Sequence, residues 1–261
     1  MESLDGKRKP LSAQAQQQDI EMAGRSVLDR EAKTLETLYQ GYFGNKENCE
    51  AVAQCIPEAS YLIQNPTIVD AGSSQGTLGN YMRERFIQRG SAPRLIMLDS
   101  NHIAMNQSSV TAEKIEGDLK ENPLANESAD IVLLRSVLHY VNKEDQTRIL
   151  REIHRTLKPY GILISQYVSF ATQAQADCFN KLFTFAAGRT IAFCGKDEGI
   201  TLHKDVFDTI LQIAEGPTLF ETFDEFFNDR VHASDEQIVG AKQYINEHLN
   251  DLGDVIMMKI C

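Results

Sequence analysis

Apolar stretches alternate with amphipathic stretches through the middle of the chain, from Thr67 to Gln166. The apolar stretches are short, rich in Val, Ile and Leu, and bounded by turn residues, as is typical of strands buried on both faces. The amphipathic stretches repeat apolar residues at helical spacing. The pattern predicts strands at 67–71, 94–99, 113–116, 130–135 and 160–166, and helices at 77–89, 101–110 and 143–157. Such alternation predicts a parallel sheet covered by helices on both faces.

The two flanks follow other patterns. Residues 1–18 are glutamine-rich and poor in large apolar groups, so we expect a disordered tail. Residues 19–66 carry two predicted helices, 20–40 and 47–62, which we interpret as a helical lid. The main domain is then 67–261, with a capping insert at about 167–233. Beyond Gln166 the pattern predicts helices at 171–187, 203–214 and 234–250 and strands near 217–223 and at 254–260, with Ser234 and Gln237 forming a capping box.

Composition narrows the function classes. The 261 residues carry a net charge of −11, which disfavours a broad nucleic-acid surface because such surfaces need clustered Lys and Arg. The five cysteines include no C-x-x-C pair, which is typical of free thiols in a reducing compartment. The first residues contain no apolar segment resembling a secretion signal or membrane span. We expect a cytoplasmic protein with a small-molecule partner and neither nucleic acid nor membrane, and its oligomeric state stays open.

A glycine loop, Gly72-Ser73-Ser74-Gln75-Gly76, follows the first predicted strand. Glycine lets backbone approach a ligand closely, and the N–H groups of the next helix point back at the loop. A dinucleotide-binding fingerprint fails, because Ser74 and Thr77 stand where it needs glycine. The G-x-S-x-G pattern of serine hydrolases does fit, with Ser74 as nucleophile. That alternative is disfavoured because the 66 residues before Thr67 look helical and contain no oxyanion-hole loop.

A third interpretation uses two acids, Asp70 near the end of the first strand and Asp99 at the end of the second. With them the chain resembles the class I S-adenosylmethionine-dependent methyltransferases, whose first motif is an apolar strand followed by acid-x-Gly-x-Gly-x-Gly. Asp70, Gly72 and Gly76 match this motif, and Ser74 replaces its middle glycine. The resemblance continues through Gly117-Asp118-Leu119, Ser128–Val132 and Leu157–Ile164, where Tyr160 stands in place of the usual glycine.

This resemblance implies a Rossmann-like, doubly wound seven-stranded sheet, mostly parallel with an antiparallel last strand, and S-adenosylmethionine as cofactor. In the family, the acid ending the second strand accepts the ribose hydroxyls and the acid matching Asp118 faces the adenine amino group. A cap at a helix start is the alternative role for Asp118. The cofactor contacts implied are Asp70, Gly72, Ser73, Ser74, Gly76, Asp99, Ser100, Asp118, Leu119 and Arg135.

The segment Leu134–Val141 leaves the fourth strand where the methyl group would lie. In relatives that methylate hydroxyls a similar phrase carries a histidine base, and His139 matches it; a packed histidine is the alternative. Tyr39, Tyr42 and Tyr167 are candidate substrate contacts. No metal is expected, because Leu133–Ser136 lacks the acids of magnesium-assisted relatives. We expect methyl transfer to a small molecule at oxygen, the alternative being a protein that binds the cofactor without methylating, as a non-methylating enzyme or a regulatory subunit.

Overall fold

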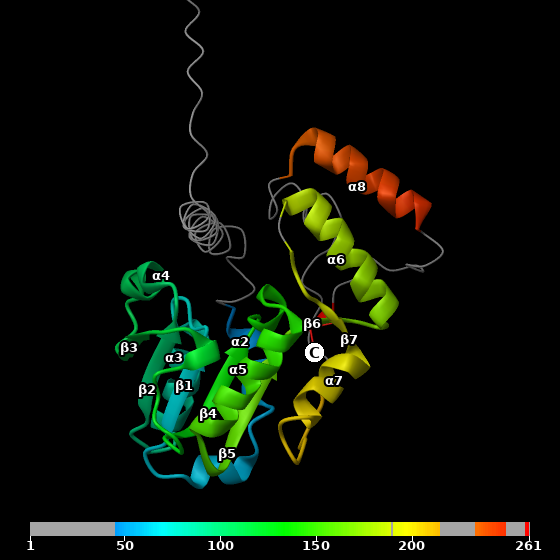
Figure 1. Cartoon of the computed structure of the whole chain (residues 1–261). Coiled ribbons are helices and arrows are strands. Elements are labelled where there is room, and N and C mark those ends of the chain that lie inside the picture. Colours follow the sequence, from blue (N-terminus) through cyan, green and yellow to red (C-terminus); the bar gives the residue numbers. More distant parts are fainter. Residues whose placement is uncertain (1–44, 189, 215–232, 249–258, 261) are drawn as a thin grey trace, which may run out of the picture.

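The computed structural model describes residues 45–188, 190–214, 233–248 and 259–260. Its centre is a five-stranded parallel sheet with the strand order β3-β2-β1-β4-β5 (Figure 1). The strands are β1 (Thr67–Ala71), β2 (Arg94–Asp99), β3 (Glu113–Glu116), β4 (Ala129–Arg135) and β5 (Leu157–Gln166). The chain moves outward from β1 to β3 and then returns to pair β4 with β1. The strand order therefore reverses between β1 and β4, which is where open α/β sheets bind ligands.

Helices cover both faces of this sheet. They are α2 (Lys46–Ala53), α3 (Thr77–Ile87), α4 (His102–Gln107) and α5 (Lys143–Thr156), with short 3-10 turns η1 (Glu58–Leu62), η2 (Leu119–Glu121) and η3 (Leu138–Tyr140). One face packs against α2 and α3 and buries Ile68, Ile131 and Leu133. The opposite face packs against α5 through Ile149 and Ile153. Strands buried on both faces explain the unbroken apolar runs of the sequence.

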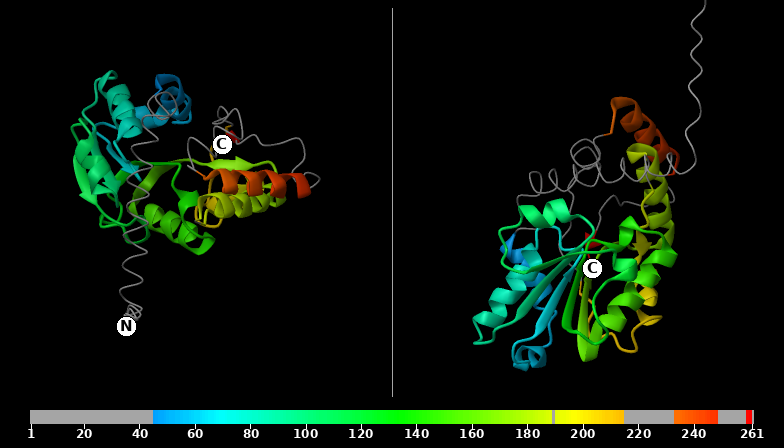
Figure 2. Two further views of the ribbon diagram at one scale, coloured as in Figure 1. Left: turned by 90° about the horizontal axis from the view of Figure 1, so that it is seen from above. Right: turned by 60° about the vertical axis from the view of Figure 1, so that its left-hand side comes forward.

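A second, smaller sheet follows directly after the first. It contains β6 (Val168–Phe170), β7 (Cys194–Gly195) and β8 (Lys259–Ile260) in the order β7-β6-β8. Its helices are α6 (Gln173–Ala187), α7 (Lys196–Lys204) and α8 (Asp235–Glu247). Helices α6 and α8 lie side by side, away from the five-stranded sheet (Figures 1 and 2). Phenylalanines at 170, 179, 183 and 193 form a separate core here.

The prediction of one seven-stranded sheet is wrong for the described residues, which form a five-stranded sheet and a three-stranded one. β5 pairs with β4 and ends at Gln166. The next strand, β6, pairs with β7 and β8 and does not pair with β4. β8 does run antiparallel to β6, but within the second sheet. The predicted strand near 217–223 and most of that at 254–260 lie outside the described residues.

The predicted helix 47–62 is divided, because α2 ends at Ala53 and η1 begins after Pro57. Proline has no N–H and restricts the residue before it, so a helix stops short of it. Residues 45–56 contribute Cys49, Val52 and Ile56 to the core under the sheet. The tail 1–18 and the first predicted helix, 20–40, lie outside the described residues.

The helix predicted at 203–214 is also misplaced, because α7 spans Lys196–Lys204. Gly199 breaks the apolar pattern, yet it lies inside the helix against Tyr167. A β-carbon at Gly199 would lie 1.9 Å from the Tyr167 hydroxyl oxygen, so this position is restricted to glycine. The capping box at the start of α8 is confirmed: Ser234 N donates to Gln237 Oε1 at 2.8 Å, and Gln237 N donates to Ser234 Oγ at 3.3 Å.

Tyr160 provides a stability test at the start of β5. It is fully exposed and adopts a positive φ of 69°, which is unfavourable for a side chain with a β-carbon. Tyr160→Gly should therefore raise the free energy of unfolding by about 0.5–1 kcal/mol, after the greater chain entropy of glycine is offset. Urea titration measures the change. Tyr160→Phe, which keeps the β-carbon, should leave stability unchanged, and a destabilised glycine variant would contradict the strain argument.

Candidate functional site

Asp70 is buried below the glycine loop with 3% of its surface exposed. Its Oδ2 accepts a hydrogen bond of 2.9 Å from Gly79 N in the first turn of α3. Burial raises the pKa of Asp70 to about 6, while the Arg135 cation and the Gly79 hydrogen bond oppose the rise and the Asp99 charge adds to it. Asp70 therefore links the end of β1 to the N-terminus of α3 and holds the loop between them.

The loop glycines are required by the packing of the protein itself. Gly72 and Gly76 have φ values of 71° and 76°, in the left-handed region that favours glycine. A β-carbon at Gly72 would lie 2.3 Å from Val137 Cγ2, and one at Gly76 would lie 2.6 Å from Met97 Sδ. Ser74 also has a positive φ, 48°, and is exposed at the tip of the loop. The loop is thus tightly seated between the ends of β2 and β4.

Asp99 ends β2 and connects it to this loop. Its Oδ2 accepts from Ser74 N at 2.7 Å, and its Oδ1 accepts from Asn101 N at 2.8 Å. Burial raises the pKa of Asp99, and the backbone N–H groups of Asn101, Ser74 and Ser100 oppose that rise. Each carboxylate oxygen has more than one lone pair, so these bonds leave acceptor capacity for a ligand. Ser100 itself is exposed next to Asp99.

Arg135 ends β4 beside the same loop. Its Nη1 lies 3.9 Å from the Sγ of Cys49 on α2, and its charge lowers the pKa values of Cys49 and Asp70. Burial is nevertheless the largest effect at both groups and raises both pKa values. The structure therefore brings Asp70, Asp99 and Arg135 together around the loop, at the point where the strand order reverses.

Asp118 lies farther out, after β3. Its Oδ1 accepts from Lys120 N at 2.8 Å, so the side chain caps η2 as in the alternative interpretation, and it remains exposed. Leu119 is buried in the core under η2. A contact of Asp118 with an adenine group stays a prediction.

Several polar atoms at the carboxyl ends of the strands are buried without a hydrogen-bond partner among the described residues. Ser73 Oγ, Ser136 Oγ and Gln166 Oε1 are buried and make no hydrogen bond within the part of the chain described by the structure. They follow β1, follow β4 and end β5, respectively. Because buried polar groups nearly always have partners, these atoms are candidates to contact a ligand. Together with the carboxylates of Asp70 and Asp99, they fit a cofactor that carries hydroxyl, ammonium and carboxylate groups.

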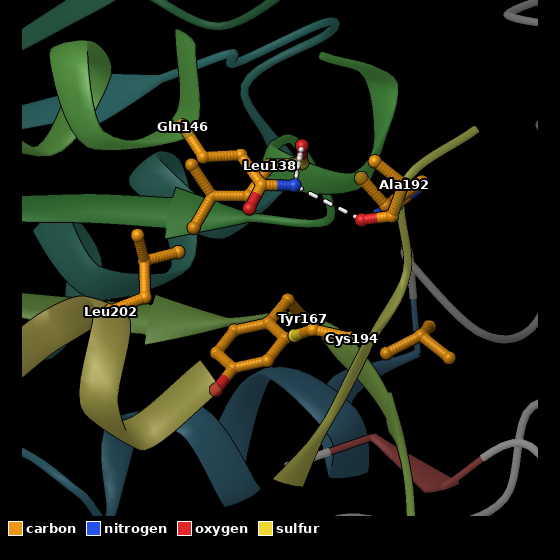
Figure 3. Close-up of a pocket in the computed structure, with 8 residues that line it drawn as sticks. Leu138, Gln146, Tyr167, Ala192, Cys194 and Leu202 are labelled. Carbon is orange, nitrogen blue, oxygen red and sulfur yellow. Dashed lines mark hydrogen bonds between the residues drawn. The ribbon is translucent and has the colours of Figure 1, made fainter. Parts of the chain in front are cut away.

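His139 lies in η3 and is buried, with 2% of its surface exposed. Its ring stacks on Phe193, with 4.8 Å between ring centroids, and contacts Tyr140. His139 lines a cavity of about 10 Å³, which has room for about one water. Figure 3 draws the residues around this cavity. His139 is therefore packed against the β7 segment in the present conformation. Its role as a base stays a prediction.

Gln146 was not predicted and holds this region together. Its Nε2 donates to Leu138 O and to Ala192 O, both at 3.0 Å (Figure 3). Ala192 N in turn donates to His139 O at 2.9 Å. The signal was present in the sequence: Gln146 is a polar residue on the face of α5 that also carries Ile149, Leu150 and Ile153.

Tyr167 separates β5 from β6 and stacks on His203 of α7, with 5.5 Å between centroids. His203 Nδ1 contacts Gly199 O at 2.8 Å and must carry the proton there, because a carbonyl can only accept. Ser165 Oγ then donates to His203 Nε2 at 2.9 Å. Burial lowers the pKa of His203, which favours this neutral form. Tyr39 and Tyr42 lie outside the described residues.

No cluster of three or more His, Cys, Asp or Glu side chains in the described residues is arranged to hold a metal ion. Of the helices the structure describes, none is both long and apolar enough to span a membrane.

Known proteins resemble this chain in sequence and in fold. Residues 69–165 match the family model described as "Methyltransferase domain". The matched segment begins in β1 and includes the glycine loop, Asp99 and the β4 exit. A carboxy-S-adenosyl-L-methionine synthase from Photorhabdus laumondii is 27% identical over 121 residues, which cover 43% of this chain and 47% of that protein. The enzyme of that name from Vibrio cholerae is 26% identical over 184 residues, which cover 62% of this chain and 71% of that protein.

Solved structures show the same fold. A protein from Bacillus halodurans described as a methyltransferase has a TM-score of 0.60 at 16% identity, covering 82% of this chain and 94% of that one. The YcgJ protein of Bacillus subtilis has a TM-score of 0.59 at 14% identity, covering 81% and 95%. Residues 69–165 thus match a methyltransferase domain that includes the glycine loop, and the chain has the fold of solved proteins described as methyltransferases.

Proposed function

We propose that the protein transfers the methyl group of S-adenosylmethionine to an oxygen atom of a small molecule. The observation that carries this proposal is the grouping of Asp70, Asp99 and the unpartnered polar atoms around one glycine loop, where the strand order reverses. A net charge of −11 supports a small acceptor over a nucleic acid.

The cofactor, when bound, supplies an electrophilic methyl group on a sulfonium. The protein's part is to fix the reacting groups in line, and such alignment contributes roughly 7–11 kcal/mol. Asp99 and the loop would hold the adenosyl part, and ionised Asp70 would favour the positive charge of the cofactor. His139 is our proposed base for a hydroxyl acceptor. An acceptor larger than water reaches its ring only if the segment around Phe193 moves, because the adjoining cavity is about 10 Å³.

A second candidate function comes from the curated relatives. The two relatives described above are named carboxy-S-adenosyl-L-methionine synthases, a name that gives a carboxylated form of the cofactor as the product. Mass spectrometry of reactions with S-adenosylmethionine separates the two. Formation of S-adenosylhomocysteine with a methylated hydroxyl compound supports the first proposal. With an added carboxylic acid that can give up its carboxyl group, a product in which that carboxylate replaces one hydrogen of the cofactor's methyl group, with release of a proton, supports the second.

Asp99→Asn tests the cofactor site. The variant keeps one acceptor but loses the charge, and a charge-assisted hydrogen bond contributes about 1.5–3 kcal/mol. We expect S-adenosylmethionine to bind about 10- to 100-fold more weakly by calorimetry. Asp208→Asn, at an exposed position after α7, is the matched control and should bind normally. Wild-type affinity in Asp99→Asn would contradict the assignment.

The raised pKa of Asp70 predicts that stability and cofactor affinity change in opposite directions with pH. Because its pKa rises from 3.8 to about 6 on folding, its contribution to stability is complete below pH 3.8 and is lost as the pH rises through 6. Between pH 5 and 7.5 the cofactor-free protein should lose about 1.5 kcal/mol of stability relative to Asp70→Asn. Affinity for the cationic cofactor should instead rise about tenfold between pH 5 and 7, as Asp70 ionises. A parallel pH profile of affinity in Asp70→Asn would contradict this role.

His139→Phe separates the base from the packing role, because phenylalanine can keep the stack on Phe193. Loss of a base should lower kcat about 10²- to 10⁴-fold with a hydroxyl acceptor. KM for S-adenosylmethionine and the Tm should change little. If His139 only packs, His139→Phe retains kcat, whereas His139→Ala lowers the Tm.

A further inference from the structure

Arg135 lies on the same face of the sheet as Asp70. Side chains alternate along a strand, and on β4 Ile131 and Leu133 face the α2 and α3 side. Arg135 continues this series. Asp70 on β1 is opposite Leu133, so Arg135 projects from the next position toward the carboxyl end, level with Gly72. The contact with Cys49 of α2 agrees with this placement.

The charge at this position differs from that of the neighbouring strand ends. Asp70 lies near the end of β1, Asp99 ends β2 and Glu116 ends β3, so the other half of the sheet edge is acidic. Arg135 is the basic residue among those ending the five parallel strands. Its charge reaches Asp70, whose pKa it lowers. A guanidinium in an acidic protein's ligand-binding edge indicates that part of the ligand is anionic.

The strand order determines which part of the cofactor lies over Arg135. If the ribose is at Asp99 on β2, the ligand must cross β1, and its other end lies over β4. That end carries the sulfonium, an ammonium and a carboxylate. A guanidinium repels the two cations and attracts the carboxylate, with which it can form two parallel hydrogen bonds.

Ser136 and Gln166 give a second, independent indication. Ser136 follows Arg135, and its N–H donates to Gln166 O at 2.7 Å, so the two residues are adjacent. Ser136 Oγ and Gln166 Oε1 are buried and have no hydrogen-bond partner within the described residues. The hydroxyl can donate to a carboxylate, and the amide oxygen can accept from an ammonium. These groups are suited to the two charged groups of an α-amino acid.

We propose that Arg135, assisted by the Ser136 hydroxyl, binds a carboxylate of the ligand held over the end of β4. The inference rests on the proposed use of S-adenosylmethionine and assigns a chemical selectivity to one residue. Two sources offer this chemistry. One is the α-carboxylate of the cofactor, and the other is a carboxylate carried on its transferred group, as in the product for which the curated relatives are named.

Calorimetric titration with three ligands tests the proposal: S-adenosylmethionine, its decarboxylated analogue and carboxy-S-adenosylmethionine. If the α-carboxylate is bound, the wild type prefers S-adenosylmethionine over the decarboxylated analogue by about 10- to 100-fold, and Arg135→Gln removes most of this preference. If the carboxylate on the transferred group is bound, the wild type prefers carboxy-S-adenosylmethionine over S-adenosylmethionine. Arg135→Gln then removes that preference. Either result supports carboxylate binding by Arg135.

Equal weakening of all three ligands in Arg135→Gln, or no weakening, would overturn the inference while leaving the proposed function intact. Failure of the wild type to bind any of the three would overturn both. Arg135→Lys keeps the charge beside Asp70 without the paired donors, and should retain a reduced preference. Arg94→Gln, at the opposite end of β2, is the matched control and should keep the full preference. Circular dichroism of each variant verifies folding.

Discussion

The hydrogen bond between the Asp70 carboxylate and Gly79 N is the constraint on which the candidate site depends. A carboxylate removed from water is unfavourable unless hydrogen bonds and opposite charge compensate it. Here α3 supplies an N–H from the positive end of its dipole, and Arg135 supplies the charge. Since Asp70 is one residue before the end of β1, this bond fixes where α3 begins. The glycine loop between them then has little conformational freedom.

The loop is also held from the side of β2. Gly72 N donates to Leu98 O at 2.8 Å, and Asp99 accepts from Ser74 N. The same carboxylate that is assigned to the cofactor therefore maintains the shape of the loop that receives it. Because Asp99 would both bind the ligand and hold the loop, a bound ligand would strengthen contacts that already exist in the free protein.

Much of the five-stranded sheet could be predicted because burial on both faces leaves unmistakable apolar runs. The limits of β1, β2 and β3 match the predicted ones, so the positions of Asp70 and Asp99 near the strand ends were predicted correctly. The second sheet could not be predicted from the sequence. Its strands are two or three residues long, too short for a periodic pattern, and its phenylalanine core joins segments distant in sequence. α7 was misplaced because the reason for Gly199, its contact with Tyr167, is 32 positions away in the chain.

The passage from β5 to β6 has a mechanical consequence. A single residue, Tyr167, separates the two strands, and its ring is fixed against His203. A hinge needs several backbone torsions that can rotate freely, and this junction offers those of one anchored residue. The three-stranded sheet and the five-stranded sheet are thus joined by a short, anchored connection. This short, anchored connection therefore restricts rotation of the second sheet against the five-stranded sheet.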